Sequence, residues 1–163
     1  MVMNRAIAKT CTSNVWDDCE RERNNRTRSN IVLKDKKAIS KYKGRNRARE
    51  EFITILVDDC LITSKTEIKC DYLLLDERNK VARLIELKGA HYNHGVNQIK
   101  NTMKIIGNEL KAMGYRKFLG KIACSRSPHI KDSDYKKLKE KIYDECKVHI
   151  DIRGNNVYEE ELS

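Results

Sequence analysis

The stretch that decides the fold lies near the middle of the chain and reads Ile68-Lys-Cys-Asp-Tyr-Leu-Leu-Leu-Asp76, Glu77-Arg-Asn-Lys80, Val81-Ala-Arg-Leu-Ile-Glu-Leu-Lys-Gly89. Two apolar runs flank a short charged turn, and this order predicts a β-hairpin. Because side chains alternate between the faces of a strand, Glu86 and Lys88 share one face near the end of the second run. Asp71, near the start of the first run, is then expected beside them.

Two carboxylates and one ammonium group brought together in this way suit the hydrolysis of a phosphodiester. Asp71 and Glu86 offer the oxygen ligands that Mg²⁺ and Mn²⁺ prefer. An ion of this kind polarises a phosphoryl oxygen and lowers the pKa of its bound water. The ammonium group of Lys88 would orient that water or help to deprotonate it. The three residues therefore predict a metal-dependent nuclease site.

An Asp, a spacer and then Glu-x-Lys resembles the signature of the PD-(D/E)xK nuclease superfamily, with Cys70 where that signature has proline. The resemblance implies Mg²⁺ or Mn²⁺ as the cofactor, held by Asp71, Glu86 and the backbone carbonyl of Leu87. It also implies that Lys88 is catalytic, and that DNA is the substrate rather than RNA. The alternative is that Glu86 and Lys88 form an ordinary ion pair on an exposed sheet face.

A helix is expected to follow the hairpin, from Asn93 to Met113. Its apolar residues recur at alternating gaps of three and four and form one buried stripe, at Val96, Ile99, Met103, Ile106, Leu110 and Met113. Gln98 borders this stripe, and the resemblance implies that it contacts the site or the nucleic acid. The alternative reading of Gln98 is a polar residue at the edge of the stripe. His91 and His94 precede and begin this helix, without further residues at zinc-site spacing.

Another helix is expected from Arg47 to about Leu61, before the hairpin. Glu50 and Glu51 would lie in its first turns, and the resemblance implies a further acidic residue on this helix near the metal. Glu51 borders the apolar side of the helix and is the candidate for that catalytic role. The alternative is that these residues complement the helix dipole.

The remaining patterns predict an α/β fold in a single domain over residues 1–163. A strand over Lys117–Ser125, a helix capped by Asp132 or Ser133 and a strand over Lys147–Arg153 follow in order. The elements resemble a three-layer, restriction-endonuclease-like αβββαβ core over residues 45–125, with a C-terminal helix and strand over 126–163. The strand that must precede Asp71 is sought in Thr63–Lys69 or Asn30–Lys34. In residues 1–35, strands over Ala6–Cys11 and Asn30–Lys34 are expected on either side of a polar loop. The acidic tail after Tyr158 is expected to fray.

The positive charge is concentrated in the first third of the chain. Residues 1–50 hold 14 Lys and Arg against 6 Asp and Glu, whereas residues 51–163 hold 20 against 18. Residues 1–44 are therefore expected to form a basic N-terminal extension. Cationic side chains bind phosphate backbones by releasing counterions, and the residues expected to do so are Lys41, Lys43, Arg45, Arg47 and Arg49.

Cysteine spacing and hydropathy bear on the compartment. The six cysteines include no C-x-x-C pair, which argues against a zinc ribbon and a redox dithiol, and free thiols are expected with a bridge left open. No apolar run reaches the roughly twenty residues that a membrane helix needs, and the N-terminus lacks the apolar core of a signal peptide. We therefore expect a cytoplasmic protein.

Nucleic acid is the expected partner, and a homodimer could supply a second half-site. Two other classes of function fit the same residues. One is a non-catalytic nucleic-acid-binding module that retains the nuclease fold. The other is a toxin or immunity-type interaction protein.

Overall fold

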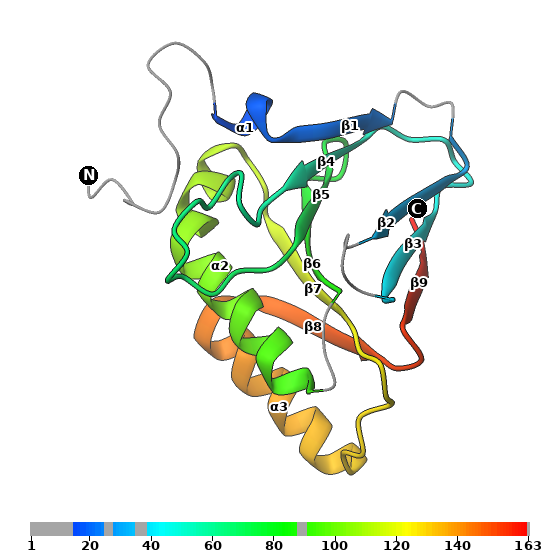
Figure 1. Cartoon of the computed structure of the whole chain (residues 1–163), viewed down its shortest axis with the longest axis vertical. Coiled ribbons are helices and arrows are strands. Elements are labelled where there is room, and N and C mark those ends of the chain that lie inside the picture. The colour runs from blue at the N-terminus through cyan, green and yellow to red at the C-terminus, as the bar shows by residue number, and fades with distance from the viewer. Residues whose placement is uncertain (1–14, 25–27, 35–38, 88–90, 163) are drawn as a thin grey trace.

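The computed structural model describes residues 15–24, 28–34, 39–87 and 91–162. These residues form a mixed α/β fold with two sheets and three helices (Figure 1). The elements are, in order, α1 (Val15–Asp18), β1 (Glu20–Asn24), β2 (Asn30–Lys34), β3 (Lys41–Arg45), β4 (Phe52–Leu56), β5 (Tyr72–Asp76), β6 (Val81–Glu86), α2 (Tyr92–Ala112), β7 (Lys117–Ala123), α3 (Asp132–Cys146), β8 (Val148–Arg153) and β9 (Val157–Glu161).

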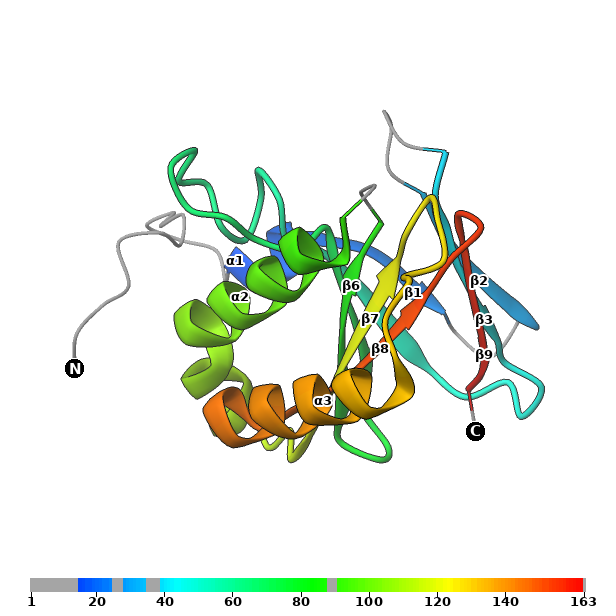
Figure 2. The ribbon, with the colours of Figure 1, turned by 90° about the horizontal axis from the view of Figure 1, so that it is seen from below.

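The larger sheet has six strands in the order β1-β4-β5-β6-β7-β8, and the smaller sheet has the order β2-β3-β9. The pairs β1–β4, β4–β5 and β5–β6 are antiparallel, whereas the pairs β6–β7 and β7–β8 are parallel. Helix α2 connects β6 to β7 and α3 connects β7 to β8. Figure 2 shows the helices on one side of the larger sheet and the smaller sheet on the other.

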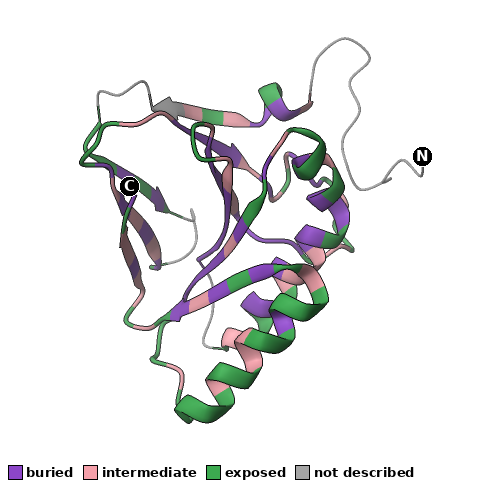
Figure 3. Cartoon of the chain, turned by 180° about the vertical axis from the view of Figure 1, so that it is seen from behind, coloured by how far each residue is buried: buried purple, intermediate pink, exposed green. Residues whose placement is uncertain are grey.

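Two apolar clusters fill the spaces between these three layers. One lies between the helices and the larger sheet, and it contains Leu73, Leu84, Ile99, Ile106 and Ile122 among others. The other lies between the two sheets and includes Tyr42, Phe52, Leu74, Ile85 and Tyr158. The central strands β4, β5 and β6 are consequently buried on both faces, as the purple strands in the middle of Figure 3 show. The described residues thus form three layers, namely the helices, the larger sheet and the smaller sheet.

The predicted hairpin is confirmed as β5 and β6, which pair from Tyr72↔Ile85 to Asp76↔Val81. The Asp76 carboxylate accepts hydrogen bonds from the backbone N–H and the side-chain amide of Asn79, both at 2.9 Å. An Asp that bonds the backbone three residues on stabilises a tight turn. The predictions of α2, β7, α3 and β8 are also confirmed.

The predicted helix over residues 47–61 is wrong, because this segment contains strand β4. Phe52, Ile53, Thr54 and Ile55 are all buried, so the strand reads as a continuous apolar run. Such a run cannot be separated from a buried helix by periodicity alone. Strand β4 precedes Asp71 and pairs with β5, whereas Thr63–Lys69 forms no strand and Asn30–Lys34 belongs to the smaller sheet.

Smaller corrections concern helix ends. Met113 was expected in the buried stripe of α2, but it follows the helix and is 39% exposed. The cap position of α3 is Lys131, without a side-chain cap bond, so the predicted cap at Asp132 or Ser133 is wrong.

The acidic tail does not fray, because residues 157–161 form β9 and pair in parallel with β3. The Glu160 carboxylate accepts hydrogen bonds from the Tyr42 hydroxyl at 2.6 Å and from Arg83 Nε at 3.1 Å. Lys121 Nζ lies 2.9 Å from the same carboxylate. Burial and then the charge of Glu160 raise the pKa of the Tyr42 hydroxyl, which therefore remains a donor. These contacts join the smaller sheet to the larger one.

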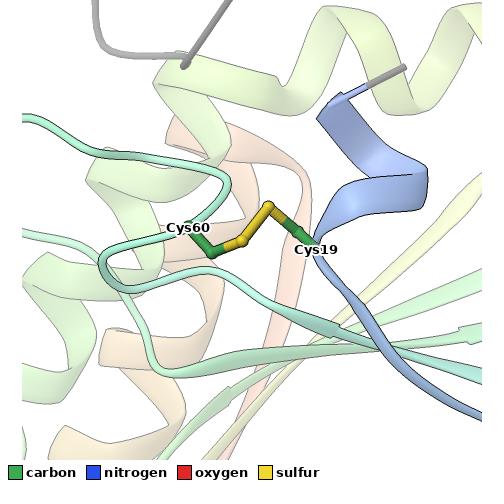
Figure 4. Close-up of a disulfide and its surroundings, with 2 residues drawn as sticks. All are labelled: Cys19 and Cys60. Atoms are coloured by element: carbon green, nitrogen blue, oxygen red, sulfur yellow. A yellow bond between two sulfur atoms is a disulfide. The ribbon is translucent and has the colours of Figure 1, made fainter. Parts of the chain in front are cut away.

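A disulfide joins Cys19, at the end of α1, to Cys60 in the turn after β4 (Figure 4). The expectation of free thiols is therefore wrong for this pair, whereas Cys70, Cys124 and Cys146 are free. Residues 1–44 contribute β1 to the larger sheet and β2 and part of β3 to the smaller one. The strand expected over residues 6–11 lies outside the described residues.

Candidate functional site

The structure brings Asp71 and Glu86 together at one end of the β5–β6 hairpin. The Asp71 backbone N–H donates to the carbonyl of Ile85 at 3.0 Å, and Asp71 Oδ2 accepts a hydrogen bond from the backbone N–H of Leu87 at 2.8 Å. Asp71 is thus bonded to the residues on both sides of Glu86. The side chains of Asp71 and Glu86 are 5% and 0% exposed. Both carboxylates therefore belong to the same largely buried end of the hairpin.

The charges of Asp71 and Glu86 both affect the pKa of the buried Cys70 thiol. Burial raises its pKa first, the hydrogen bond with Thr102 opposes the rise, and the charges of Glu86 and Asp71 raise it further. Both carboxylates therefore act on the same buried atom. The Cys70 Sγ itself donates to the carbonyl of Tyr72 at 3.6 Å.

The segment that leads into Asp71 is held by three side chains of α2. Gln98 Nε2 donates to the carbonyl of Lys69 at 3.0 Å, and Asn101 Nδ2 donates to the carbonyl of Ile68 at 2.6 Å. Thr102 Oγ1 accepts a hydrogen bond from the backbone N–H of Cys70 at 2.9 Å. Gln98 thus stands where it was expected, on the helix after Glu-x-Lys, and it binds protein backbone. The contributions of Asn101 and Thr102 were missed, because nothing in their spacing marks them.

Helix α2 approaches the carboxylate pair closely at Gly95. A Cβ atom at this position would lie 2.8 Å from Ile122 Cγ2 and 3.4 Å from Glu86 Cγ. The first turn of α2 therefore packs directly on Glu86, which a larger residue would prevent. His91 is the cap residue of this helix, and both His91 and His94 are exposed.

Asp71 also lines a cavity of about 650 Å³ between the two sheets. Its walls come from β1, β2, β4 and the turn after β4, and they include Arg21, Lys34, Thr54, Asp58, Asp59 and Tyr72. Asp58 Oδ1 lies 3.2 Å from Nζ of the buried Lys69. Sequence reasoning missed Asp58 and Asp59, since acidic residues directly after a strand stand out only once β4 is known to be a strand.

Several candidate residues lie elsewhere. In the β4–β5 register Phe52 faces Asp76 and Leu56 faces Tyr72, so Glu51 is beyond the turn end of the hairpin. Five strand residues, or roughly 17 Å, separate it from the Asp71 end. The structure does not bring Glu51 to the carboxylate pair, because its segment is a strand and not a helix over the site. Lys88 lies outside the described residues.

The basic residues expected to bind nucleic acid lie on and after β3, beside acidic residues of β9. Lys43 Nζ is 3.6 Å from Glu159, and Arg45 binds both Glu159 and Glu161. Arg47 lies 3.2 Å from Glu161. The β3–β9 register places Lys41 opposite Val157. The negative charge of β9 thus offsets part of the patch, a compensation that only the pairing of distant strands reveals.

Arg49 lies in the turn before β4 with a left-handed backbone (φ 53°). Among the described residues, no group of three or more His, Cys, Asp or Glu side chains is placed to hold a metal ion. No helix in the described ranges is both long and apolar enough to cross a membrane. In comparisons with protein-family models, curated proteins and solved structures, nothing matches this chain.

Proposed function

We propose that the protein is a divalent-metal-dependent nuclease that hydrolyses phosphodiester bonds, with DNA preferred over RNA. One observation carries the proposal. Asp71 forms hydrogen bonds with Ile85 and Leu87, the residues on either side of Glu86, at one end of the adjacent strands β5 and β6. Two neighbouring carboxylates in the sequence context Asp, spacer, Glu-x-Lys support the resemblance to PD-(D/E)xK nucleases.

The order of elements gives further support. Strands β4, β5 and β6 form an antiparallel meander, and β7 then runs parallel to β6 after helix α2. This is the order βββαβ of the restriction-endonuclease-like core. The helix that opens that core has no counterpart directly before β4, where the described residues form β3 and a turn. The proposed fold therefore departs from the family pattern at its first element.

The donor set fits a hard cation such as Mg²⁺ or Mn²⁺, because it consists of carboxylate and carbonyl oxygens. Asp71, Glu86 and the Leu87 carbonyl would hold the ion. When bound, it would polarise the phosphoryl oxygen and lower the pKa of a water molecule. The hydrogen bond from the Leu87 N–H fixes the orientation of the Asp71 carboxylate. Lys88, by the same resemblance, would position the attacking water.

Gln98 is proposed as a positioning residue rather than a catalytic one. Its amide holds the carbonyl of Lys69, two residues before Asp71. Loss of this bond would loosen the backbone that carries the carboxylate. A displacement of about 1 Å at a reacting centre can cost a hundredfold in rate.

The second candidate is a nucleic-acid-binding module without catalysis. The burial of the two carboxylates favours this second candidate, because in a nuclease the phosphodiester must reach the ion that the carboxylates hold. In that case Asp71 and Glu86 would stabilise the end of the hairpin and nothing more.

The test is incubation of the pure protein with supercoiled plasmid, single-stranded DNA and RNA, with Mg²⁺ or Mn²⁺ and with EDTA. The matched variants are Asp71→Asn, which keeps an oxygen that can accept the Leu87 N–H, and Lys88→Ala. Metal-dependent cutting that both variants lose supports the nuclease. Cutting that persists in Asp71→Asn would contradict the proposed site. Nucleic-acid binding without cutting would favour the second candidate.

A further inference from the structure

A second cavity, of about 590 Å³, lies at the end of the molecule away from Asp71 and Glu86. Its lining residues come from the C-terminal ends of α2 and α3 and from the starts of β7 and β8. We call it the basic pocket, defined by Lys111, Arg116, Lys117, Tyr143, Lys147 and His149. In the β6–β7 register Lys117 pairs with Val81, five residues before Glu86. The pocket is therefore roughly 17 Å along the strands from the carboxylate pair.

The lining of the basic pocket contains no carboxylate. Lys111, Arg116, Lys117 and Lys147 are exposed, and none forms an ion pair with a carboxylate of the described residues. The nearby Glu77 carboxylate is already bound by Lys80 at 2.7 Å and by the Tyr115 hydroxyl. The patch on β3 differs, because β9 supplies its counter-charges. The basic pocket therefore keeps its positive charge and would attract anions.

An exposed aromatic pair forms one wall of the pocket. Tyr143 is 40% exposed, and its ring stacks on that of His149 with centroids 4.5 Å apart and an angle of 29°. Lys147 Nζ lies 5.0 Å from the centre of the Tyr143 ring. A flat ring next to flexible cations matches a nucleotide, since the base can stack while an ammonium group moves to the phosphate.

We propose that the basic pocket binds a segment of single-stranded nucleic acid, with an unpaired base on the Tyr143–His149 rings and phosphates on the surrounding cations. Only an unpaired base can present its face to such a platform. The proposal does not depend on cleavage at Asp71 and Glu86. Together the two regions would let the protein hold an unpaired strand at one end while the other end engages a phosphodiester.

The experiment measures the anisotropy of labelled oligonucleotides of about 12 nucleotides, as single-stranded DNA, single-stranded RNA and the matched duplex, in EDTA. The whole chain is compared with Tyr143→Ala, with Tyr143→Phe and with the double variant Lys111→Ala/Lys147→Ala. Lys136→Ala/Lys137→Ala is the matched control, because it removes the same charge from the exposed first half of α3. Polyglutamate serves as a competitor that has charge and no bases.

We expect Tyr143→Ala to weaken single-strand binding about tenfold and Tyr143→Phe to leave it within about twofold, as base stacking on an aromatic ring predicts. The Lys111/Lys147 variant should reduce the slope of log K against log salt by about 0.7 per cation. The control pair should leave the slope unchanged.

The inference is overturned if Tyr143→Ala binds like the wild type, if the control pair lowers the slope equally, or if polyglutamate competes as well as single-stranded DNA. Photo-crosslinking of a bromouracil-labelled strand to the wild-type chain adds a readout that needs no variant. A crosslink in the peptide around Tyr143 supports the site, and crosslinks confined to other peptides refute it. Binding measured in EDTA is independent of cleavage, so the proposed nuclease activity can fail without this result changing.

Discussion

The carboxylate of Asp71 accepts a hydrogen bond from the backbone N–H of Leu87 at 2.8 Å, across the end of the β5–β6 hairpin. The residue that precedes one strand is thereby fixed to the residue that follows the next. The Asp71 N–H also donates to the carbonyl of Ile85, so Asp71 is hydrogen-bonded to the residue before Glu86 and to the residue after it. Any function of this pair depends on that arrangement.

The two acidic candidates at opposite ends of the hairpin should differ in their effect on cleavage. In the proposed nuclease, Asp71→Asn should lower the rate by about a hundredfold or more, because it removes the charge of one of the two carboxylates that would hold the ion. Glu51→Gln should keep the rate within about twofold, since Glu51 lies beyond the turn end of the hairpin, far from Asp71. Single-turnover cleavage under equal metal concentrations measures both. A large loss in Glu51→Gln would return this residue to the site.

Gly95→Ala should destabilise the protein by about 1–3 kcal/mol, as overpacking of a core does. The added Cβ would lie 2.8 Å from Cγ2 of Ile122, a fully buried branched side chain, so the surrounding packing would have to shift. Gly107→Ala is the matched control on the same helix, because its nearest neighbour is the flexible tip of Met103 at 3.0 Å. This control should be neutral or stabilising by up to about 1 kcal/mol. Urea unfolding compares them, and equal losses would disprove the packing argument.

Thr102→Val should destabilise the protein by about 1–3 kcal/mol, because it leaves the buried N–H of Cys70 without its acceptor. Thr102→Ser keeps the hydroxyl and removes one methyl group, so it should cost about 1 kcal/mol or less. The difference between the two variants in urea unfolding measures the hydrogen bond itself. If serine costs as much as valine, methyl packing accounts for the effect.

Reduction of the Cys19–Cys60 disulfide should lower the free energy of unfolding by about 3–4 kcal/mol. The two cysteines are 41 residues apart, and a loop of that size restricts the unfolded chain accordingly. Thermal unfolding with and without reductant measures the change, with Cys19→Ser/Cys60→Ser as the genetic equivalent. Cys146→Ser is the control, since this cysteine is free. An identical transition with and without reductant would show that the bond does not contribute.

The parts of the fold that were predicted correctly depend on local patterns. The hairpin follows from two apolar runs around Glu77–Lys80, and α2 follows from the three-and-four spacing of Val96, Ile99 and Met103. The proximity of Asp71 to Glu86 comes from strand alternation and hairpin register together. None of these requires knowledge of a distant segment.

The parts that were missed depend on partners far away in the chain. Strand β4 is apolar on both faces because a second sheet covers the face that the helices do not, and nothing in its own periodicity shows this. The tail is held as β9 because its residues pair with β3 more than a hundred positions earlier. The same pairing places Glu159 and Glu161 beside Arg45 and Arg47, which in the sequence alone resemble a basic patch without counter-charges.

The sequence by itself determined the hairpin, the helix after it and the presence of two acidic residues at one strand end, because these follow from neighbours within a few residues. Tertiary structure alone decided that Glu51 lies away from this pair, which cations keep their charge and which cysteines bond. Those outcomes depend on the packing of three layers, in which each contact is made by residues that the chain separates widely. Asp71 and Glu51 carry the same charge, and only the register of β4 against β5 puts them at opposite ends of the sheet.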